Sequence, residues 1–350
     1  MKPVGPIPPG YGALEGELAI GGRTASALVE EAGGTPLFVY SRALLDKRVA
    51  DLRAALPERI GVNYAVKANP LPAVVVHMEP LVDGFDIASA GELAILQDAG
   101  IDPARISFAG PGKREEELEA AIAAGVTLNC ESAGEAARSL AIGERLGQRP
   151  RIAIRVNPSF ELKGSGMKMG GGAKQFGVDA DVVPALARDV IGQGAEWRGL
   201  HIFTGSQALS AEAIAETQAN VLNLAAELAE QIGHGLPKLN MGGGFGIPYF
   251  PGDEALDLAA VGKALAERVA NLPPALAETE LCLELGRYLA GEAGVYLCRI
   301  VDRKESHGTT YLVTDGGLHH QLAASGNFGT VVRRNYPSAI ATRFPGEPSE

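Results

Sequence analysis

A lysine follows directly after one of the apolar runs in this sequence. Ile60 to Val66 is apolar and β-prone, and Lys67 comes next. Pro70 and Pro72 follow, in positions that suit a loop and the first turn of a helix. We therefore expect Lys67 at the end of a strand. A lysine amine that loses its charge on burial is a good nucleophile for a carbonyl group. A strand-end lysine that extends into water is the simpler interpretation of Lys67 alone.

Other polar side chains and glycines occupy equivalent positions after later runs. Glu284 lies in the last such run, with Arg287 behind it, and Ser206 and Gly242–Gly244 follow the two runs before it. A hydroxyl, exposed backbone N–H groups and a guanidinium together suit a phosphate group. The remaining candidates at run ends are Asp86, Ser89, Glu92, Gly110–Gly112, Glu131, Arg155 and Asn157.

The elements that must position these residues alternate regularly along the chain. Eight apolar or β-prone runs occur at 60–66, 84–88, 105–109, 126–130, 151–156, 198–203, 238–241 and 280–285. Helix-like segments lie between them, near 71–79, 90–99, 114–124, 132–147, 180–192, 210–232 and 257–270. Strands that alternate with helices pair in parallel, and eight units predict a closed (β/α)8 barrel, whose active site lies at the carboxyl ends of the strands. An open doubly wound sheet competes with this fold, but no GxGxxG turn opens the pattern.

In a closed barrel the candidate residues gather at one end. The first and eighth strands become neighbours, which brings the amine of Lys67 toward the carboxylate of Glu284. An amine, a phosphate site and a carboxylate are what pyridoxal phosphate requires, because the lysine forms a Schiff base and the carboxylate keeps the pyridine nitrogen protonated. Each piece also has an ordinary interpretation as a tight turn, an ion pair or a turn hydroxyl. Their joint occurrence at the ends of successive strands favours the cofactor.

A series of motifs resembles one enzyme family. They are YAVKAN at 64–69, FDIASAGEL at 85–93, FAGPGK at 108–113, NCES at 129–132, RVNP at 155–158, KQFGV at 174–178, GSQ at 205–207, GGGFG at 242–246 and ELGRY at 284–288. Across roughly residues 35 to 320 they resemble the fold-type-III pyridoxal phosphate decarboxylases, the diaminopimelate and ornithine decarboxylase group. The segments HIFTGSQ and TDGGLHHQLAASGNFG look most like a subgroup associated with exosortase and exopolysaccharide systems.

The resemblance implies a role for individual residues. Lys67 would carry the cofactor and Glu284 would face its pyridine nitrogen, so that these two are the expected catalytic residues. The remaining residues implied to bind the cofactor are Asp86, Arg155, Phe203, Ser206, Gly243, Gly244, Gly286 and Arg287, with Glu92 also in the inner pocket. The family also implies a homodimer with a shared active site.

Three departures from the family pattern concern the reaction and the substrate. Phe203 replaces the usual histidine that stacks on the cofactor, and phenylalanine stacks without hydrogen-bonding or carrying charge. Leu318 to Asn327 lacks the arginine and tyrosine expected for diaminopimelate, so Arg287, His319 and His320 are the substrate-binding candidates. For His319 and His320 a plain polar loop is an equal alternative. The late cysteine motif and C-terminal tyrosine are absent, so we expect a truncated form of the enzyme.

Beyond the barrel, a smaller β domain is expected. Residues 295–301 and 309–314 read as strands joined by a polar turn at 302–308, and the strand candidate at 11–20 could join them. The predicted divisions are therefore residues 1–34 as leader and added strand, 35–286 as the cofactor-binding barrel, and 287–350 as an incomplete β domain.

Composition excludes several classes of function. The chain has 350 residues, of which 46% are hydrophobic, and a formal net charge of −11 without a dense basic stripe, which argues against nucleic acid as a partner. Cys130, Cys282 and Cys298 form no CxxC pair, as is usual for reduced cytosolic thiols. No signal peptide or uncharged apolar run of about 20 residues is present. We expect a cytoplasmic enzyme without a membrane partner or a metal.

The prediction is thus a pyridoxal phosphate-dependent carboxy-lyase that acts on an amino acid, free or carrier-linked. A racemase on the same fold is one alternative, although racemase-type sites place arginine against the ring nitrogen, whereas Glu284 suits the stronger electron sink that decarboxylation needs. A cofactor-binding regulatory homologue without catalysis is the other, because of Phe203 and the missing terminal motifs.

Overall fold

The computed structural model describes residues 5–322 and 336–345. The chain forms two compact units. The first contains Met1–Lys47, Pro248–Ala255 and Gly291–Glu350, and the second contains Arg48–Ile247 and Leu256–Ala290. Helix α2 (Arg42–Ala55) begins in the first unit and ends in the second. Among the described helices, none is long and apolar enough to cross a membrane.

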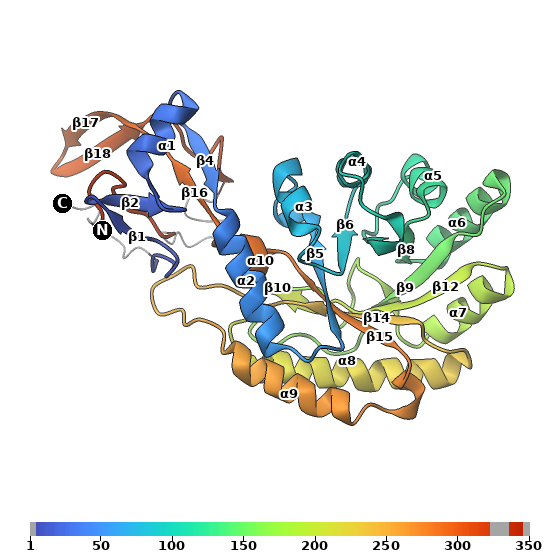
Figure 1. Ribbon diagram of the computed structural model, residues 1–350. Coiled ribbons are helices and arrows are strands. Elements are labelled where there is room, and N and C mark those ends of the chain that lie inside the picture. Colours follow the sequence, from blue (N-terminus) through green and yellow to red (C-terminus); the bar gives the residue numbers. More distant parts are fainter. Residues whose placement is uncertain (1–4, 323–335, 346–350) are drawn as a thin grey trace. The chain divides into compact units, whose positions relative to one another are not determined.

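Eight parallel strands of the second unit close into a ring (Figure 1). Each strand pairs with the next along the chain, and the eighth, β15, pairs with the first, β5, which closes the barrel. The strands are β5 (Ile60–Ala65), β6 (Gly84–Ile87), β7 (Ile106–Phe108), β8 (Thr127–Cys130), β9 (Arg151–Asn157), β12 (Glu196–His201), β14 (Lys238–Gly243) and β15 (Glu280–Leu285). They correspond to the eight predicted runs, so the (β/α)8 barrel is confirmed.

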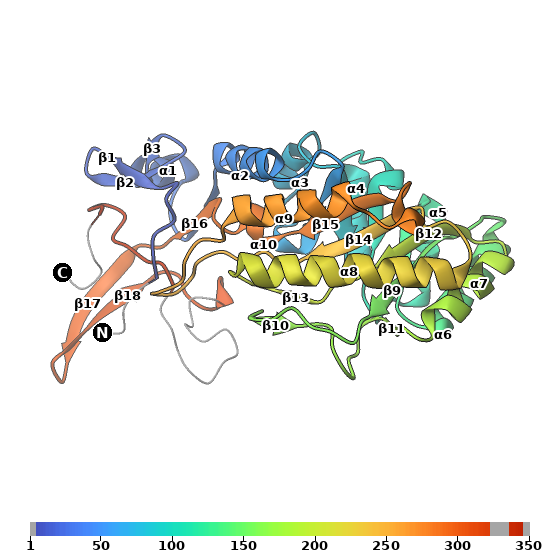
Figure 2. The same cartoon turned by 90° about the horizontal axis from the view of Figure 1, so that it is seen from below.

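Helices surround the strands on the outside of the barrel, and α8 and α9 run side by side in both views (Figures 1 and 2). The helices are α3 (Pro72–Met78), α4 (Ala90–Asp98), α5 (Glu115–Ala124), α6 (Ala133–Leu146), α7 (Val183–Gly192), α8 (Ala211–Ile232) and α9 (Leu258–Ala270), followed by the single turn α10 (Arg287–Ala290). Short 3₁₀ turns also occur, namely η1 (Val66–Ala68), η2 (Pro103–Arg105) and η3 (Pro274–Leu276). One face of each strand is covered by the helices, and the other face points into the packed interior of the barrel. Both faces are therefore buried, and the strand sequences are nearly continuous apolar runs.

Local sequence fixes where several of these helices begin and end. The hydroxyls of Ser89, Ser132 and Ser210 each accept a hydrogen bond from the backbone N–H three residues later, which satisfies an otherwise unpaired donor. Gly147 and Gly233 end α6 and α8 in the left-handed conformation that glycine adopts without strain.

Short strand pairs at the barrel mouth have no counterpart among the predicted runs. Strand β10 (Met167–Lys168) pairs antiparallel with β13 (Gly205–Ser206), and β11 (Val178–Asp179) pairs in parallel with the last two residues of β9. Two-residue strands contain too few residues for a periodic pattern, so sequence periodicity cannot reveal them.

The first unit holds short sheets around a small core. A sheet of β1 (Gly12–Leu14), β2 (Glu17–Ile20) and β3 (Arg23–Thr24) leads into α1 (Ala25–Ala32), and β4 (Leu37–Tyr40) pairs antiparallel with β16 (Gly294–Leu297). The buried core consists of Leu18, Ile20, Ala25 and Leu297. The Leu18 N–H donates to the carbonyl of Ala341, so segments from both ends of the chain pack in this unit.

Two strand predictions in this unit are wrong. The candidate at 11–20 is divided by a turn at Glu15 and Gly16 into β1 and β2, which pair antiparallel with each other and form a sheet with β3. The expected strand at 295–301 is divided into β16 and β17 (Ile300–Ser306), and most of the expected turn at 302–308 belongs to β17. The turn that joins β17 to β18 (Thr309–Thr314) is made by His307 and Gly308, with φ of 48° and 76°. Both strands of this ribbon are exposed. Residues Asp302 to Ser306 of β17 are polar and lack the apolar alternation that reveals a strand, whereas the predicted strand at 309–314 is confirmed.

Candidate active site

The amine and the carboxylate predicted to face one another lie together at one end of the barrel. Lys67 lies in η1, directly after β5, and Glu284 lies on the neighbouring strand β15. The Lys67 Nζ is 3.7 Å from the Glu284 Oε1. The Glu284 side chain is only 5% exposed, whereas that of Lys67 is 56% exposed. The amine can therefore move while the carboxylate is held in place.

A cavity of about 440 Å³ opens at the carboxyl ends of the barrel strands. Its walls include four of the predicted site residues, namely Lys67, Asp86, Arg155 and Glu284. Lys113 and Phe176 contribute further wall. The volume falls in the range of small-molecule sites, and the position is the one at which barrel enzymes bind their substrates.

Asp86 is a buried carboxylic acid on the cavity wall. Its Oδ1 accepts hydrogen bonds from the Ser107 hydroxyl and, at 3.4 Å, from the Asn240 amide. Its Oδ2 has no hydrogen-bond partner in the part of the chain that the structure describes. Burial and the nearby charge of Glu284 raise the pKa of Asp86 to about 7, against the lowering effect of Ser107.

The pKa of Glu284 is shifted in the opposite direction because of a residue that the sequence did not single out. His201, at the end of β12, is buried, and its Nε2 lies 3.0 Å from the Glu284 Oε2. Burial alone would raise the pKa of Glu284, but the His201 hydrogen bond and the charge of Lys67 outweigh it and hold the pKa at about 2. Glu284 is therefore an anion at neutral pH.

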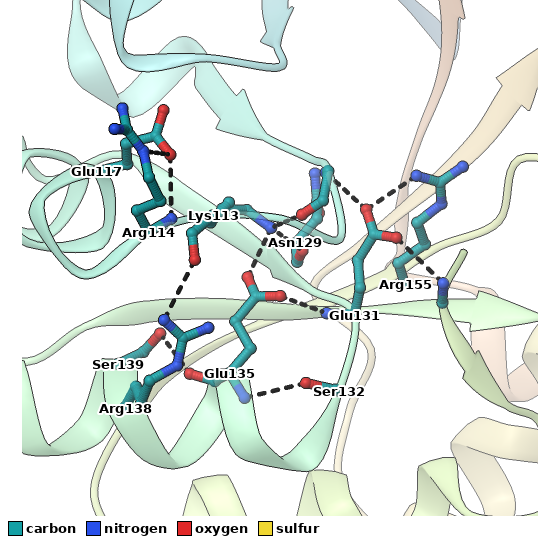
Figure 3. Close-up of polar contacts among 12 residues, drawn as sticks. Lys113, Arg114, Glu117, Asn129, Glu131, Ser132, Glu135, Arg138, Ser139 and Arg155 are labelled. Carbon is teal, nitrogen blue, oxygen red and sulfur yellow. Dashed lines mark hydrogen bonds and ion pairs between the residues drawn. The ribbon is translucent and has the colours of Figure 1, made fainter. Parts of the chain in front are cut away.

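Arg155 is held at the cavity by a second buried carboxylate. Glu131, which follows β8, accepts a hydrogen bond from the Arg155 Nη1 at 2.9 Å (Figure 3). The same Oε1 accepts from the Gly110 N–H at 2.6 Å, and Oε2 accepts from the Gly177 N–H at 3.1 Å. The guanidinium also lies 4.9 Å from the centre of the Phe176 ring. One side chain thus ties three segments of the barrel mouth together.

Lys113 also borders the cavity, but its ammonium is fully engaged. Its Nζ donates to the Glu135 carboxylate at 2.5 Å, to the Asn129 carbonyl at 3.1 Å and to the Gly110 carbonyl at 2.7 Å (Figure 3). The other Glu135 oxygen accepts from the Glu131 N–H at 3.2 Å. The side chains of Lys113 and Glu135 are 1% and 2% exposed. All three donors of Lys113 are used, so this lysine fixes the loop at Gly110.

The glycines and the serine predicted to bind phosphate form a neighbouring cluster outside the walls of this cavity. Gly243 pairs with Glu284, and a Cβ atom on Gly243 would lie 2.2 Å from the Glu284 carbonyl oxygen. Gly244 has φ of +80°, and a Cβ there would lie 2.7 Å from the carbonyl oxygen of Gly205, the residue before Ser206. Only glycine allows the chain to approach so closely at these two positions.

Arg287 begins α10 beside this cluster. Its Nη1 donates to the Gln207 Oε1 at 3.4 Å, and Gln207 follows Ser206 directly. Gly286 packs against Ala68, since a Cβ at Gly286 would lie 3.0 Å from that of Ala68. The structure thus brings Ser206, the glycine turn and Arg287 to the same end of the barrel as Glu284.

Phe203 and Glu92 also lie near Lys67. The Lys67 Nζ is 5.8 Å from the centre of the half-buried Phe203 ring. Glu92 is not part of the cavity wall; its Oε2 accepts from the Ala88 N–H at 2.8 Å, so it caps the start of α4. His319 and His320 belong to the other unit, where the Tyr296 hydroxyl lies 3.0 Å from the His320 Nδ1. Much of the segment 318–327 lies outside the described residues, and the role of the two histidines stays a prediction.

Residues 42–291 match a family model for the pyridoxal binding domain of pyridoxal-dependent decarboxylases. The chain belongs to the pyridoxal-dependent decarboxylases. An L-glutamyl-[BtrI acyl-carrier protein] decarboxylase from Niallia circulans is 33% identical over 310 residues, which cover 87% of this chain and 71% of that protein. A diaminopimelate decarboxylase from Aquifex aeolicus is 34% identical over 323 residues, or 89% of this chain and 73% of that protein.

Solved structures agree with this assignment. A crystal structure of an Aquifex aeolicus protein superposes on this decarboxylase with a TM-score of 0.78 and 32% sequence identity, over 91% of this chain and 74% of that one. Pyridoxal phosphate is accordingly the cofactor, and the enzyme class is that of a carboxy-lyase.

The residues present fit this cofactor. The cavity supplies an exposed amine beside a buried anion, and close to them lies a turn whose glycines let the backbone approach more closely than a side chain would allow. A buried anion is costly unless it is paired, and Glu284 has His201 and Lys67 as partners. Such a carboxylate is the group that a protonated pyridine nitrogen needs.

Proposed function

We propose that this enzyme removes CO2 from the α-carbon of an amino acid, either free or linked to a carrier, with Lys67 and Glu284 as its catalytic residues. The observation that carries the proposal is the 3.7 Å approach of an exposed amine to a buried, ionised carboxylate at the wall of a cavity of ligand size. When bound, the cofactor supplies an electron sink for the carbanion that loss of CO2 leaves behind.

Each side chain then has a defined task. Lys67 would hold the cofactor aldehyde through its amine, and its exposure would allow it to give way to a substrate amine and return. Glu284 would hold a proton on the ring nitrogen, because its carboxylate is ionised. Phe203 lies within reach of Lys67 and would pack on the ring face. Ser206, Gly243, Gly244 and Arg287 would hold the phosphate.

Two further residues act at the cavity wall. Asp86 and Arg155 present one acid and one guanidinium to the cavity. Glu131 orients the guanidinium of Arg155. The remaining N–H groups of Arg155 can then donate to a carboxylate or phenolate oxygen of a bound molecule. Arg287, His319 and His320 remain the proposed contacts to the distal part of the substrate.

The substrate class follows from the relatives and from the sequence. Relatives include both a carrier-linked glutamate decarboxylase and diaminopimelate decarboxylases. The segment 318–327 contains no arginine or tyrosine, which the second carboxylate of diaminopimelate would need as a partner. We therefore place a carrier-linked or simpler amino acid ahead of diaminopimelate.

Assembly and cellular role complete the proposal. The motif HIFTGSQ at 201–207 supports a role in the exosortase-associated subgroup, and the family resemblance supports a cytoplasmic homodimer with a shared site. Light scattering of the purified protein would measure its mass: twice the chain mass supports the dimer, and a monomer at all concentrations contradicts it.

Release of labelled CO2 tests the proposal. Carboxyl-labelled amino acids and their acyl-carrier conjugates would be incubated with the protein and pyridoxal phosphate. We expect CO2 from at least one substrate, and its loss in Lys67→Ala, while Lys163→Ala, which alters an exposed lysine paired with Glu216, retains full activity. Loss of optical rotation without CO2 would indicate a racemase, and cofactor binding without any turnover would indicate a regulatory homologue.

A further inference from the structure

His201 is a buried imidazole whose only described hydrogen bond is to Glu284. Its Nε2 lies 3.0 Å from the Glu284 Oε2, and the two side chains are 2% and 5% exposed. The Nδ1 has no hydrogen-bond partner among the described residues. A buried imidazolium would need acceptors for two N–H groups, but the site provides only one. The ring is therefore neutral and carries its hydrogen on Nε2.

The two oxygens of Glu284 face different partners. Oε2 receives the His201 hydrogen, and Oε1 is the oxygen 3.7 Å from the Lys67 amine at the cavity wall. A carboxylate that is free to rotate would exchange these oxygens, whereas a hydrogen bond to one of them fixes its plane. We propose that His201 is a positioning residue, which donates from Nε2 to Glu284 Oε2 and so keeps Oε1 directed at the cavity. This inference rests on the proposed function, in which Glu284 meets the ring nitrogen of the cofactor.

His201 has an aromatic neighbour, Phe203, at a position that the family resemblance singles out. His201 and Phe203 are two residues apart, with ring centres separated by 6.5 Å. By the family resemblance, Phe203 occupies the position of a histidine that would stack on the cofactor, and phenylalanine cannot donate or accept a proton. The imidazole of His201 contacts the Glu284 carboxylate instead.

Charged groups around the pair agree with a neutral histidine. Burial lowers the pKa of His201, and the nearby Arg155 acts in the same direction, against the opposing effects of Glu284 and Glu131. The Glu284 carboxylate faces Lys67, Arg155 and the acid of Asp86 as well as His201. Loss of the histidine donor would remove one of the groups that keep Glu284 ionised, so it should bring protonation of Glu284 to higher pH.

The first test needs neither substrate nor cofactor, and it uses a variant only to assign the signal. Nitrogen-15 NMR of the protein, labelled at histidine and without added cofactor, reports which ring nitrogen carries hydrogen, with His201→Gln used to assign the signal. We expect a neutral Nε2–H form throughout pH 6 to 8. An Nδ1–H form in that range would leave no hydrogen on Nε2 and would overturn the proposal.

The second test compares two variants. His201→Gln places an amide donor near the position of Nε2, and His201→Leu removes the donor at similar volume. A hydrogen bond to a charged group contributes about 1.5–3 kcal/mol, so we expect His201→Leu to lower kcat by about 10–100-fold. The absorbance of the bound cofactor should also change when Glu284 becomes protonated. In His201→Leu we expect this change at a higher pH than in the unmodified protein. His201→Gln should recover most of both properties.

The outcomes separate this proposal from the function on which it rests. Equal losses in both variants, with unchanged pH dependence, would show that His201 only fills space and would overturn the proposal. If the unmodified protein released no CO2 from any substrate, the proposed function would fail, while the NMR form and the cofactor pH transition would still decide whether His201 positions Glu284.

Discussion

The pKa values of two buried carboxyl groups near the cavity are shifted in opposite directions. Burial and the charge of Glu284 raise the pKa of Asp86, whereas His201 and Lys67 overcome the effect of burial at Glu284. Pairs of acids whose environments push their pKa values apart commonly divide the acid and anion roles in an active site. At the scale of single residues, we therefore propose Asp86 as the acid and Glu284 as the anion.

This difference predicts a pH dependence of stability. The pKa of Asp86 rises from 3.8 to about 7 on folding, so between these values the folded protein keeps a proton that the unfolded chain loses. The free energy of unfolding should therefore fall as pH rises through this window, by up to about 1.4 kcal/mol for each unit of pH. Asp86→Asn should remove this part of the slope, as measured by urea denaturation from pH 4 to 8.

A matched control for that experiment is Asp98→Asn, at the exposed end of α4. It should retain the slope of the unmodified protein. If the free energy of unfolding changed with pH in the same way in Asp86→Asn and in the unmodified protein, Asp86 would not be the group responsible for the slope.

Some residues of the candidate site can be predicted from the sequence, and others cannot. Lys67 and Glu284 end recognisable apolar runs, so their meeting follows from the barrel. His201 lies inside such a run, and Glu131 follows one beside a cysteine. A polar residue there could equally be a satisfied core residue, and only its distance to a partner distinguishes the two cases. The charge state of Asp86 likewise depends on burial, which a linear pattern does not give.

At the scale of elements, Glu131 joins the loop after β7, strand β9 and the segment before β11. Glu131→Gln retains the size but loses the charge and one acceptor. Loss of hydrogen bonds to a charged group corresponds to about 10–100-fold weaker binding. We expect the Kd for pyridoxal phosphate to rise to that extent, as measured by fluorescence titration. Glu119→Gln, at an exposed ion pair with Arg145, should leave the Kd unchanged; an equal effect in both variants would contradict the role of Glu131.

The glycine turn after β14 offers a second prediction at this scale. Gly243→Ala would force a Cβ to 2.2 Å from the Glu284 carbonyl oxygen, and overpacking of this kind costs about 1–3 kcal/mol. We expect a lower melting temperature and weaker cofactor binding. Gly192→Ala, where a Cβ meets no atom within 4 Å, is the matched control and should be neutral or slightly stabilising. Tolerance of Gly243→Ala without loss of stability or binding would contradict the close approach.

Elements differed in how well the sequence revealed them. Barrel strands and helices are long enough for periodicity, and their eight repeats specified the fold. Strands β10, β11 and β13 are each two residues long, and β17 carries charged side chains on an exposed ribbon. Neither kind has an apolar pattern, so backbone pairing alone defines them.

At the scale of the whole molecule, cofactor binding should stabilise the folded chain by mass action. A ligand at about 100 times its Kd adds about 2.7 kcal/mol to the free energy of unfolding. We expect pyridoxal phosphate to raise the melting temperature of the unmodified protein by several degrees in differential scanning fluorimetry. Lys67→Ala should lose most of this increase, and Lys163→Ala should retain it. An equal increase in all three proteins would place binding elsewhere.

The central claim is that the cofactor is bound through Lys67, and borohydride reduction tests it most directly. Reduction of the protein with pyridoxal phosphate fixes the cofactor to the amine that holds it, and peptide mass spectrometry then identifies that amine. The cavity wall contains two lysines, Lys67 with an exposed amine and Lys113 with all three donors engaged. We predict one label per chain, on Lys67. A label on Lys113 or another lysine, with Lys67 unmodified, would contradict this account.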